Sequence, residues 1–539
     1  MILKDKADLS AAKSIHNKKD KTRFVFEQLN STAQKSQANI INLLNLRHIY
    51  YQSFYAVNAI RIKCNAESLP EIADLDQVKL VINNGALTFH KPVEMYQDNL
   101  RGPNSIEWGI DMINANDVWA LGYRGQGVVV GGEDTGYQWD HPAIITNYRG
   151  WDGTNVDHNY NWHDAIHELN IANGDTTQNI CGLNLLAPCD DYGHGTHTMG
   201  TMVGFTPGDT IGVAPAAKWI GVRNMETGDG KPSTYIEAFE WFIAPTDLNN
   251  QNPNPDKSPD VINNSWGCPP SEGCDITNFY IMNEVVKNVK AAGIVVVVSA
   301  GNSGSGCSSV DDPAAMFEES FSVGAMKAND TIANFSSRGP VAIDSSFRRK
   351  PNVSAPGVGV RSCIPGNNYA YFSGTSMAGP HVVGAVALIL SAEPVLAGEV
   401  DMIEDILEST AVPKTSDQDC GSIPGNVVPN NTYGYGRIDA LAAVNKAFVV
   451  TGTGNHVEKA IVKIFPNPVS DLLYLDCNGF TGNVKVEIMD ITGKLISSFN
   501  DNLQGRKILK SQLPAEMHGM FIYKVSSKDL EFTGKFVKL

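Results

Sequence analysis

The central part of the chain contains short runs of consecutive apolar residues that each end in polar residues or glycine. These runs are 127–130, 261–262 and 294–298, and helix-like spacing of apolar residues separates them, at 235–243 and 281–292. A strand that is apolar on both sides must be buried on both sides, as in a parallel sheet covered by helices. We therefore predict an α/β domain with a doubly wound parallel sheet. In such sheets the chemistry gathers beyond the carboxyl ends of the strands.

The segment before this domain has a different pattern. Residues 1–30 are polar and rich in lysine, and apolar residues then recur at helix-like spacing over 40–59. Strand-like segments follow at 56–62 and 78–82, and Asp, Asn, Gly and Pro dominate 96–105. These patterns predict a small α/β unit followed by a linker.

The last 75 to 80 residues alternate between apolar and polar side chains, for example at 484–488 and 521–525. This period of two predicts a small antiparallel β-sandwich, joined through a flexible linker at 451–455. With 539 residues the chain is long enough for several domains. We expect three, at 1–100, 105–449 and 460–539.

The net charge of −16 is unevenly distributed. Residues 1–100 carry 13 basic and 10 acidic side chains, residues 101–450 carry 18 and 39, and residues 451–539 carry 11 and 9. A strongly acidic body repels phosphate backbones, so we expect no nucleic-acid partner. No apolar run reaches membrane-spanning length, so we expect no transmembrane segment.

Seven of the nine cysteines lie between residues 181 and 420. The close pairs Cys181/Cys189 and Cys268/Cys274 lie in loops rich in Gly, Pro and Asp, and this setting favours disulfides over a zinc site. Because seven is odd, at least one central thiol is free or pairs outside its domain.

Three polar motifs follow a predicted strand or open a predicted helix, and they present Asp134, His194 and Ser376 in that order. A serine hydroxyl becomes a good nucleophile when an imidazole takes its proton, and a carboxylate on the other ring nitrogen fixes the tautomer. The helix that begins near Ser376 would direct N–H groups toward a developing oxyanion. The side-chain amide of Asn302, at a strand end, is suited to donate to the same oxyanion.

Four strings carry a resemblance to a known family. They are Asp134-Thr-Gly, His194-Gly-Thr-His, Ser299-Ala-Gly-Asn302 and Gly374-Thr-Ser-Met-Ala. In this order they resemble the subtilisin-like serine peptidases, over about 108–447, and 148–163 resembles the bacillopeptidase F branch.

The resemblance implies the family's fold and a serine endopeptidase that acts on proteins or peptides. It implies Asp134, His194 and Ser376 as the catalytic triad and Asn302 as the oxyanion donor. The substrate-binding residues it implies are Ser265, Trp266, Gly267 and Gly301.

The chain departs from the family pattern at several positions. The 60 residues between Asp134 and His194 predict an inserted loop at 137–190. Glu133 replaces a usually apolar residue and is expected to point away from Asp134, because strand side chains alternate. The chemistry needs no cofactor. A structural calcium ion is left open, because Ala143 stands where the family often has a calcium-binding Asp.

Both ends of the chain carry further resemblances. Residues 1–100 resemble, in size and position, the propeptides that assist folding and inhibit the cleft, so the chain's own propeptide is an expected partner. The tail, with 464–468 and 490–494, resembles the sorting domain of the type IX secretion system. This resemblance implies a secreted or cell-surface protein, with a signal peptide that precedes the sequence as given.

The same residues allow other interpretations. Asp134-Thr-Gly is also typical of aspartic proteases, but these need two such carboxylates and no second copy occurs. His163 and His167 mimic a zinc-peptidase helix without its Glu, and we interpret them as surface histidines of a loop helix. His197 and His381 are expected to pack, whereas Trp266 either shapes a pocket or packs. A catalytically silent surface adhesin on the same scaffold is the alternative function.

Overall fold

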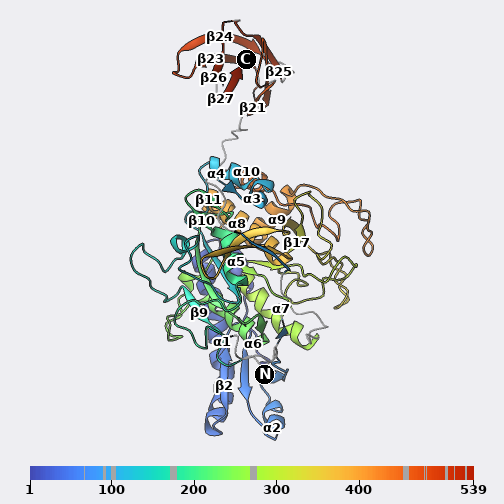
Figure 1. Cartoon of the computed structure of the whole chain (residues 1–539). Helices are drawn as coiled ribbons and strands as arrows, with labels where there is room; N and C mark the ends of the chain where they lie inside the picture. Colours follow the sequence, from blue (N-terminus) through green and yellow to red (C-terminus); the bar gives the residue numbers. More distant parts are fainter. Residues whose placement is uncertain are drawn as a thin grey trace. The chain divides into compact units, whose positions relative to one another are not determined.

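The computed structural model divides into two compact units, Met1–Val450 and Thr451–Leu539 (Figure 1). The three predicted domain boundaries stay predictions. The residues that the structure describes are 1–65, 67–85, 87–88, 93–98, 105–169, 179–267, 276–452, 461–465, 467–478, 480, 482–503, 508–514, 516–527 and 531–539.

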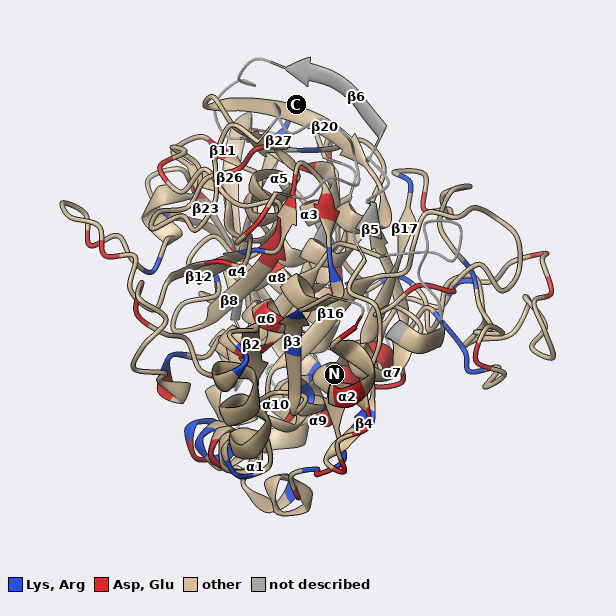
Figure 2. Cartoon of the chain, turned by 90° about the horizontal axis from the view of Figure 1, so that it is seen from below, with Lys and Arg blue, Asp and Glu red and all other residues tan. Residues whose placement is uncertain are grey.

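A seven-stranded parallel sheet forms the centre of the first unit, in the order β18-β17-β16-β15-β8-β12-β9. Its strands are β8 (Val129–Asp134), β9 (Trp162–Asp164), β12 (Lys218–Arg223), β15 (Val261–Asn264), β16 (Val295–Ser299), β17 (Phe321–Met326) and β18 (Val353–Pro356). Helices cover it, among them α5 (His194–Val203), α6 (Pro232–Ile243), α7 (Ile276–Ala291) and α8 (Thr375–Ala392), labelled in Figures 1 and 2. The predicted α/β class with a parallel sheet is confirmed.

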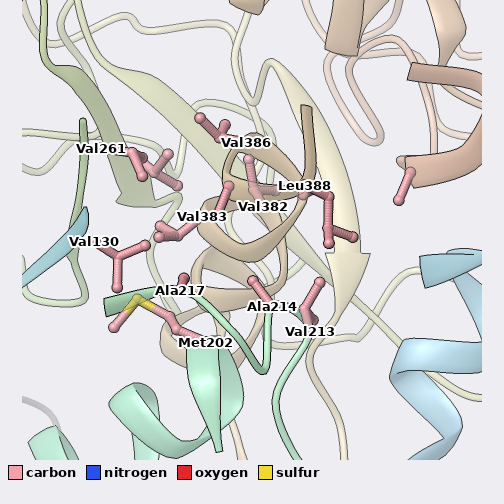
Figure 3. Close-up of a cluster of buried hydrophobic side chains, with 14 of the residues drawn as sticks. Val130, Met202, Val213, Ala214, Ala217, Val261, Val382, Val383, Val386 and Leu388 are labelled. Carbon is pink, nitrogen blue, oxygen red and sulfur yellow. The ribbon is translucent and has the colours of Figure 1, made fainter. Parts of the chain in front are cut away.

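Two apolar cores lie on opposite faces of this sheet. On one face Val130 and Val261 pack with Val382 and Val386 of α8 and Met202 of α5 (Figure 3). The other core joins the remaining strand positions to α6 and α7, including Ile262, Val296, Phe239, Phe242 and Val285. Because alternate strand residues point to opposite faces, both sets of side chains had to be apolar.

Helix α8 is the central helix of the first core. Among the described residues it is the one helix with the length and apolar content of a membrane span, and 94% of it is buried inside the protein. Gly384 of α8 faces Val213, where an added Cβ would come within 2.4 Å of the Val213 Cβ. The helix therefore packs closely against the chain around Val213.

The N-terminal segment packs in the same unit. Its helix α1 (Lys18–Leu46) accompanies an antiparallel sheet in the order β2-β3-β1-β4, with β1 (Ile2–Leu3), β2 (Tyr50–Phe54), β3 (Ala59–Lys63) and β4 (Val78–Leu80). The predicted helix over 40–59 is wrong after residue 46, and the helix begins 22 residues earlier than expected. Small and polar residues occupy much of its buried face, including Thr22, Ala33, Ser36 and Gln37.

The expected linker at 96–105 is also wrong in part. β6 (Val93–Asp98) pairs antiparallel with β20 (Asn368–Ser373), far along the chain, and β7 (Ser105–Ile106) pairs with β11 (Asp209–Thr210). A polar sequence can form a strand here because a partner strand supplies the backbone hydrogen bonds. The remaining elements of this unit are α2 (Leu69–Ala73), β5 (Leu87–Thr88), α3 (Trp108–Met112), α4 (Ala115–Ala120), β10 (Phe205–Thr206), β13 (Met225–Glu226), β14 (Asp229–Gly230), β19 (Val360–Ile364), α9 (Val400–Thr410) and α10 (Ala440–Thr451).

The disulfides agree with the cysteine pattern where the structure describes them. Cys181 pairs with Cys189, as predicted, and Cys307 pairs with Cys420. The predicted pair Cys268/Cys274 lies outside the described residues. Among the cysteines that the structure describes, the free thiols are those of Cys64, Cys363 and Cys477, which include one central thiol.

The second unit consists of antiparallel strands, as predicted. One sheet has the order β21-β22-β25 and the other β24-β23-β26-β27. The strands are β21 (Ile461–Phe465), β22 (Leu472–Asn478), β23 (Asn483–Asp490), β24 (Leu495–Asn502), β25 (Ile508–Gln512), β26 (Gly519–Ser526) and β27 (Glu531–Lys538). Val486, Leu475 and Phe536 lie in its own apolar core.

Truncating the core face of α8 tests this packing. Leu388→Ala should lower the free energy of unfolding by about 2–5 kcal/mol, because Leu388 is fully buried and its removal leaves a cavity. Val395→Ala, at a position 66% exposed, is the control and should change it by less than about 0.5 kcal/mol. Denaturant unfolding measures both, and equal effects would contradict the assigned core.

Candidate active site

The polar motifs lie at the carboxyl edge of the parallel sheet. β8 ends at Asp134, β15 is followed by Ser265, and β16 is followed by the turn that carries Asn302. Helices α5 and α8 begin with His194 and Thr375 and pack against each other. Parallel strands direct all their carboxyl ends to one edge, so side chains far apart in the sequence meet there.

Asp134 and His194 are joined by a short hydrogen bond. Asp134 Oδ1 lies 2.7 Å from His194 Nδ1, and both side chains are 1% exposed. The same oxygen accepts the Thr135 N–H at 2.8 Å, and Oδ2 accepts the Thr198 hydroxyl at 3.3 Å. This arrangement holds the carboxylate still and favours the imidazole tautomer with the proton on Nδ1. In the neutral ring, Nε2 is then the proton acceptor.

Ser376 lies in the first turn of α8, where the N-terminal end of the helix dipole is positive. Its hydroxyl donates to the Ser265 carbonyl at 3.3 Å, and the Ser265 hydroxyl donates to the Ser376 carbonyl at 3.0 Å. The Asn263 amide donates to the Ser265 hydroxyl at 2.8 Å. These bonds fix the end of β15 against the start of α8.

The Asn302 side chain is held by the residue before Ser376. Its Oδ1 accepts the Thr375 N–H at 2.9 Å and the Thr375 hydroxyl at 3.0 Å, so the Nδ2 group is left to donate. A Cβ built on Gly374 would lie 3.6 Å from the Ser376 nitrogen and 3.7 Å from Asn302 Nδ2. Both N–H donors therefore border the same small space, which the missing side chain of Gly374 leaves open.

The expected substrate-binding residues take different places around this space. Trp266 is 3% exposed, and its ring stacks on Tyr235 with centroids 3.8 Å apart and an interplanar angle of 16°. Gly301 has a φ of 101°, which favours glycine. A Cβ on Gly267 would lie 2.9 Å from Asp312. The packing role of Trp266 is thus observed, while the substrate-binding roles of all four residues stay predictions.

Glu133 lies on the opposite side of β8 from Asp134. It is fully buried, and its Oε1 accepts the Trp266 indole N–H at 3.1 Å. Burial raises the pKa of Glu133 well above the usual value of a glutamate. Burial therefore favours the neutral form of this carboxyl group beside Asp134.

Two histidines near the motifs, His197 and His381, have surroundings typical of packing residues. The His197 ring stacks on Phe372, and burial lowers its pKa to about 3. His381 Nδ1 lies 2.8 Å from the Met377 carbonyl, and burial lowers its pKa to about 4. Both rings are neutral at neutral pH, as expected for packing residues.

The interpretation of His163 and His167 as surface residues of a loop helix is wrong. His163 lies in β9 and is 8% exposed, and each histidine places Nε2 within 2.8 Å of Glu237 Oε1. Burial alone would lower the pKa of His167, but the hydrogen bond and charge of Glu237 raise it to about 9. Both rings are thus hydrogen-bonded to one carboxylate oxygen of Glu237, which lies on α6. Among the described residues, no three His, Cys, Asp or Glu side chains form a group that could hold a metal.

The calcium position of the family is altered as well. Ala143 is 1% exposed, and its side chain has no ligand atom. That the chemistry needs no cofactor stays a prediction.

Sequence reasoning missed two residues that hold the Asp134 carboxylate. Thr135 lies in Asp134-Thr-Gly, and Thr198 lies in the longer motif His194-Gly-Thr-His-Thr-Met-Gly200, but neither threonine had an assigned role. The distances of 2.8 and 3.3 Å to Asp134 identify them. The position of both threonines within a motif was the sequence signal that could have identified them.

Comparisons with known proteins show which families the two parts of the chain are similar to. Residues 125–436 match the family model described as "Subtilase family", and 463–539 match the "Secretion system C-terminal sorting domain". Bacillopeptidase F of Bacillus subtilis (strain 168) is 38% identical over 457 residues, which are 81% of this chain and 29% of that protein. Subtilisin E of the same strain is 34% identical over 57% of this chain and 66% of its own length.

Subtilisin DY of Bacillus licheniformis is 33% identical over 63% of this chain and 98% of its own length. The chain thus spans less than two thirds of bacillopeptidase F and of subtilisin E, and nearly all of subtilisin DY. The family model covers more than half of the chain. The chain belongs to the subtilase family.

Proposed function

We propose that the chain is a secreted serine endopeptidase that cleaves peptide bonds in proteins through an acyl-enzyme. The observation that carries this proposal is the 2.7 Å bond between Asp134 and His194, at the sheet edge where Ser376 also lies. A buried carboxylate on Nδ1 orients the imidazole and stabilises it when Nε2 takes up a proton. The subtilase family membership supports the same chemistry.

The first step uses this arrangement. His194 Nε2 takes the proton of the Ser376 hydroxyl while Oγ attacks the carbonyl carbon of the substrate. The Ser376 hydroxyl must first turn from the Ser265 carbonyl, which it contacts at 3.3 Å. Such bonds are weak at this length, and catalytic hydrogen bonds often tighten only with substrate bound.

The second requirement is stabilisation of the oxyanion. The Ser376 N–H and Asn302 Nδ2 border one space, so both are placed to donate to the negative oxygen of the tetrahedral intermediate. His194 then gives its proton to the leaving amine, and water repeats the sequence on the acyl-enzyme. No metal or organic cofactor takes part in these steps.

We further propose that the N-terminal segment acts as a propeptide that blocks the site. β5 pairs antiparallel with β14, and β6 pairs antiparallel with β20, which ends at Ser373 just before the Ser376 turn. Strands of this segment therefore lie on two backbone edges next to the catalytic residues. Their position supports inhibition in cis.

Opposite charges also join the N-terminal segment to the body. Lys18 Nζ lies 2.9 Å from Asp260, and Lys6 Nζ lies 2.7 Å from Glu284. Further pairs join Arg23 to Asp256, Lys21 to Glu399 and Arg61 to Glu168. Figure 2 shows basic positions along α1 and acidic positions on α6 and α7. Some of the basic side chains of residues 1–100 and of the acidic side chains of residues 101–450 thus form ion pairs with each other.

The C-terminal match supports the location that we propose. A secretion-system sorting domain at 463–539 suggests export or attachment at the cell surface, and the type IX machinery is the proposed partner. The substrates are then extracellular proteins or peptides. Nucleic acid is not a proposed partner, because the body is strongly acidic.

A fluorophosphonate probe tests whether the chain is an enzyme. Protein freed of its N-terminal segment should be labelled at Ser376, because the probe reacts with serines activated by a base. Ser376→Ala should lose labelling and turnover of a protein substrate. If the segment-free protein is not labelled, or Ser376→Ala is labelled equally, the adhesin alternative replaces the enzyme.

The oxyanion space has its own test. Gly374 has an extended backbone, with φ 170° and ψ 161°, so Gly374→Ala should fold normally. Its methyl group would occupy the space between the two donors and lower kcat. Asn302→Leu removes one donor and should lower kcat by about 10²–10³, the size measured on subtilisin itself. Steady-state kinetics with circular dichroism measure both, and an unchanged kcat in folded Gly374→Ala would contradict the site.

Glu240 of α6 should make inhibition by the N-terminal segment depend on pH. Its Oε2 accepts the Ala56 N–H at 2.8 Å, and loss of solvent raises its pKa from 4.5 to about 8. A raised pKa means that the complex takes up a proton. Association is therefore strongest below about pH 4.5 and weakens as the pH rises to about 8.

The measurement is the inhibition constant of added segment 1–100 at several pH values. Glu240→Gln should remove this part of the pH dependence, since glutamine does not titrate. Equal pH dependence in both proteins would show that other groups are responsible, and no inhibition at micromolar concentration would contradict the propeptide role.

A further inference from the structure

We infer that Asp190 is a positioning residue for catalysis, which locks the strand end that carries Asp134 to the helix that carries His194. This inference rests on the proposed function of these two residues. Asp190 lies four residues before His194, at the end of the 137–190 insertion, and is 6% exposed. Its two carboxylate oxygens accept five hydrogen bonds from both sides of the Asp134–His194 pair.

On the strand side, Asp190 fixes Thr135. The Thr135 hydroxyl donates to Asp190 Oδ1 at 2.8 Å and accepts the Gly195 N–H at 3.0 Å. Because a hydroxyl has one proton, donation to Asp190 directs its lone pairs toward Gly195. The residue after Asp134 is thereby tied to the residue after His194.

On the helix side, the same carboxylate fixes the first turn of α5. Oδ1 accepts the N–H groups of Tyr192 and Gly193 at 3.0 and 2.7 Å. Oδ2 accepts the N–H and the hydroxyl of Thr196 at 2.9 and 2.6 Å. These donors lie on both sides of His194 in the sequence, so the backbone that carries the imidazole has little freedom to shift.

The chain around Asp190 is itself fixed. The preceding residue, Cys189, forms the disulfide with Cys181, and Asp190 pairs with Gly136 in an isolated β-bridge. Gly136 has a φ of 108°, and a Cβ there would lie 1.8 Å from the Cys189 carbonyl oxygen. Only glycine allows this approach. The carboxylate is therefore presented to both elements from a rigid position.

The role differs from that of an ordinary helix cap. A cap satisfies N–H groups of one helix, whereas Asp190 also bonds the Thr135 hydroxyl on a different element. Misplacement of reacting groups by about 1 Å can cost about 100-fold in rate. Loss of Asp190 should therefore lower kcat strongly while the protein stays folded.

Asp190→Asn tests this inference. If its oxygen keeps the bonds of Oδ1, its NH₂ group faces the Thr196 N–H, and two donors oppose each other. We expect kcat to fall about 10- to 100-fold with KM within about twofold of wild type. A purely structural role would lower the fraction of molecules that the probe labels and leave kcat per labelled molecule unchanged.

Matched variants separate the contacts. Thr135→Val removes the hydroxyl and should resemble Asp190→Asn, whereas Thr135→Ser keeps it and should stay near wild type. The double variant Asp190→Asn/Thr135→Val should lose more kcat than either single variant, because Asp190→Asn disturbs the Thr196 bonds whereas Thr135→Val removes the Thr135 bond. Asp191→Asn is the control. Asp191 is a buried neighbouring carboxylate that bonds Arg223 and the Thr227 N–H instead.

All variants are made as the full chain, activated by the same limited proteolysis, and counted with the fluorophosphonate probe so that kcat refers to active molecules. Turnover in Ser376→Ala would overturn the proposed function and this inference with it. Loss in Ser376→Ala, with a kcat of Asp190→Asn within about twofold of wild type, would overturn this inference alone. The inference also fails if Asp191→Asn loses as much kcat as Asp190→Asn.

Discussion

Burial of one sheet on both faces is the constraint on which the rest of the structure depends. A strand such as β16, with four consecutive valines, has no solvent-facing side, so helices must cover both faces. α5 and α8 cover one face and α6 and α7 the other. The helices of the first face begin at the carboxyl edge of the sheet, and their first turns carry His194 and Ser376. The packing that stabilises the domain thus also places the proposed catalytic residues at one edge of the sheet.

The sequence predicted this part well because its signals are local. A run of valines, or a motif next to a strand end, can be interpreted without knowing what lies beside it. Helix α1 shows the opposite case, since its buried face includes Gln37, whose amide bonds the Phe54 carbonyl and Asn58 at 3.0 Å. A buried polar residue that forms hydrogen bonds inside the protein interrupts the periodic spacing of apolar residues from which a helix is predicted. β6 was missed for a related reason, because its partner β20 lies far along the chain.

The same distinction applies to the site. Asp134, His194, Ser376 and Asn302 stand in recognisable strings, so the sequence alone is enough to propose them as site residues. The groups that hold them are not recognisable in this way, because their contacts cross 55 to 64 residues of sequence. Asp190 illustrates this: an acidic residue in a Gly- and Asp-rich loop has no distinctive pattern, and only its hydrogen bonds separate it from Asp191. The positions of catalytic groups were thus easier to predict than the means by which they are held.

The insertion between β8 and α5 also adds a strand at the edge of the central sheet. β9, which it contributes, is only three residues long and forms the edge strand beside β12. The opposite edge, β18, is four residues long and ends in Pro356, which has no N–H to offer. Short or proline-ended edges give a second sheet little to pair with. The central sheet therefore offers little at either edge for pairing with the sheet of another copy.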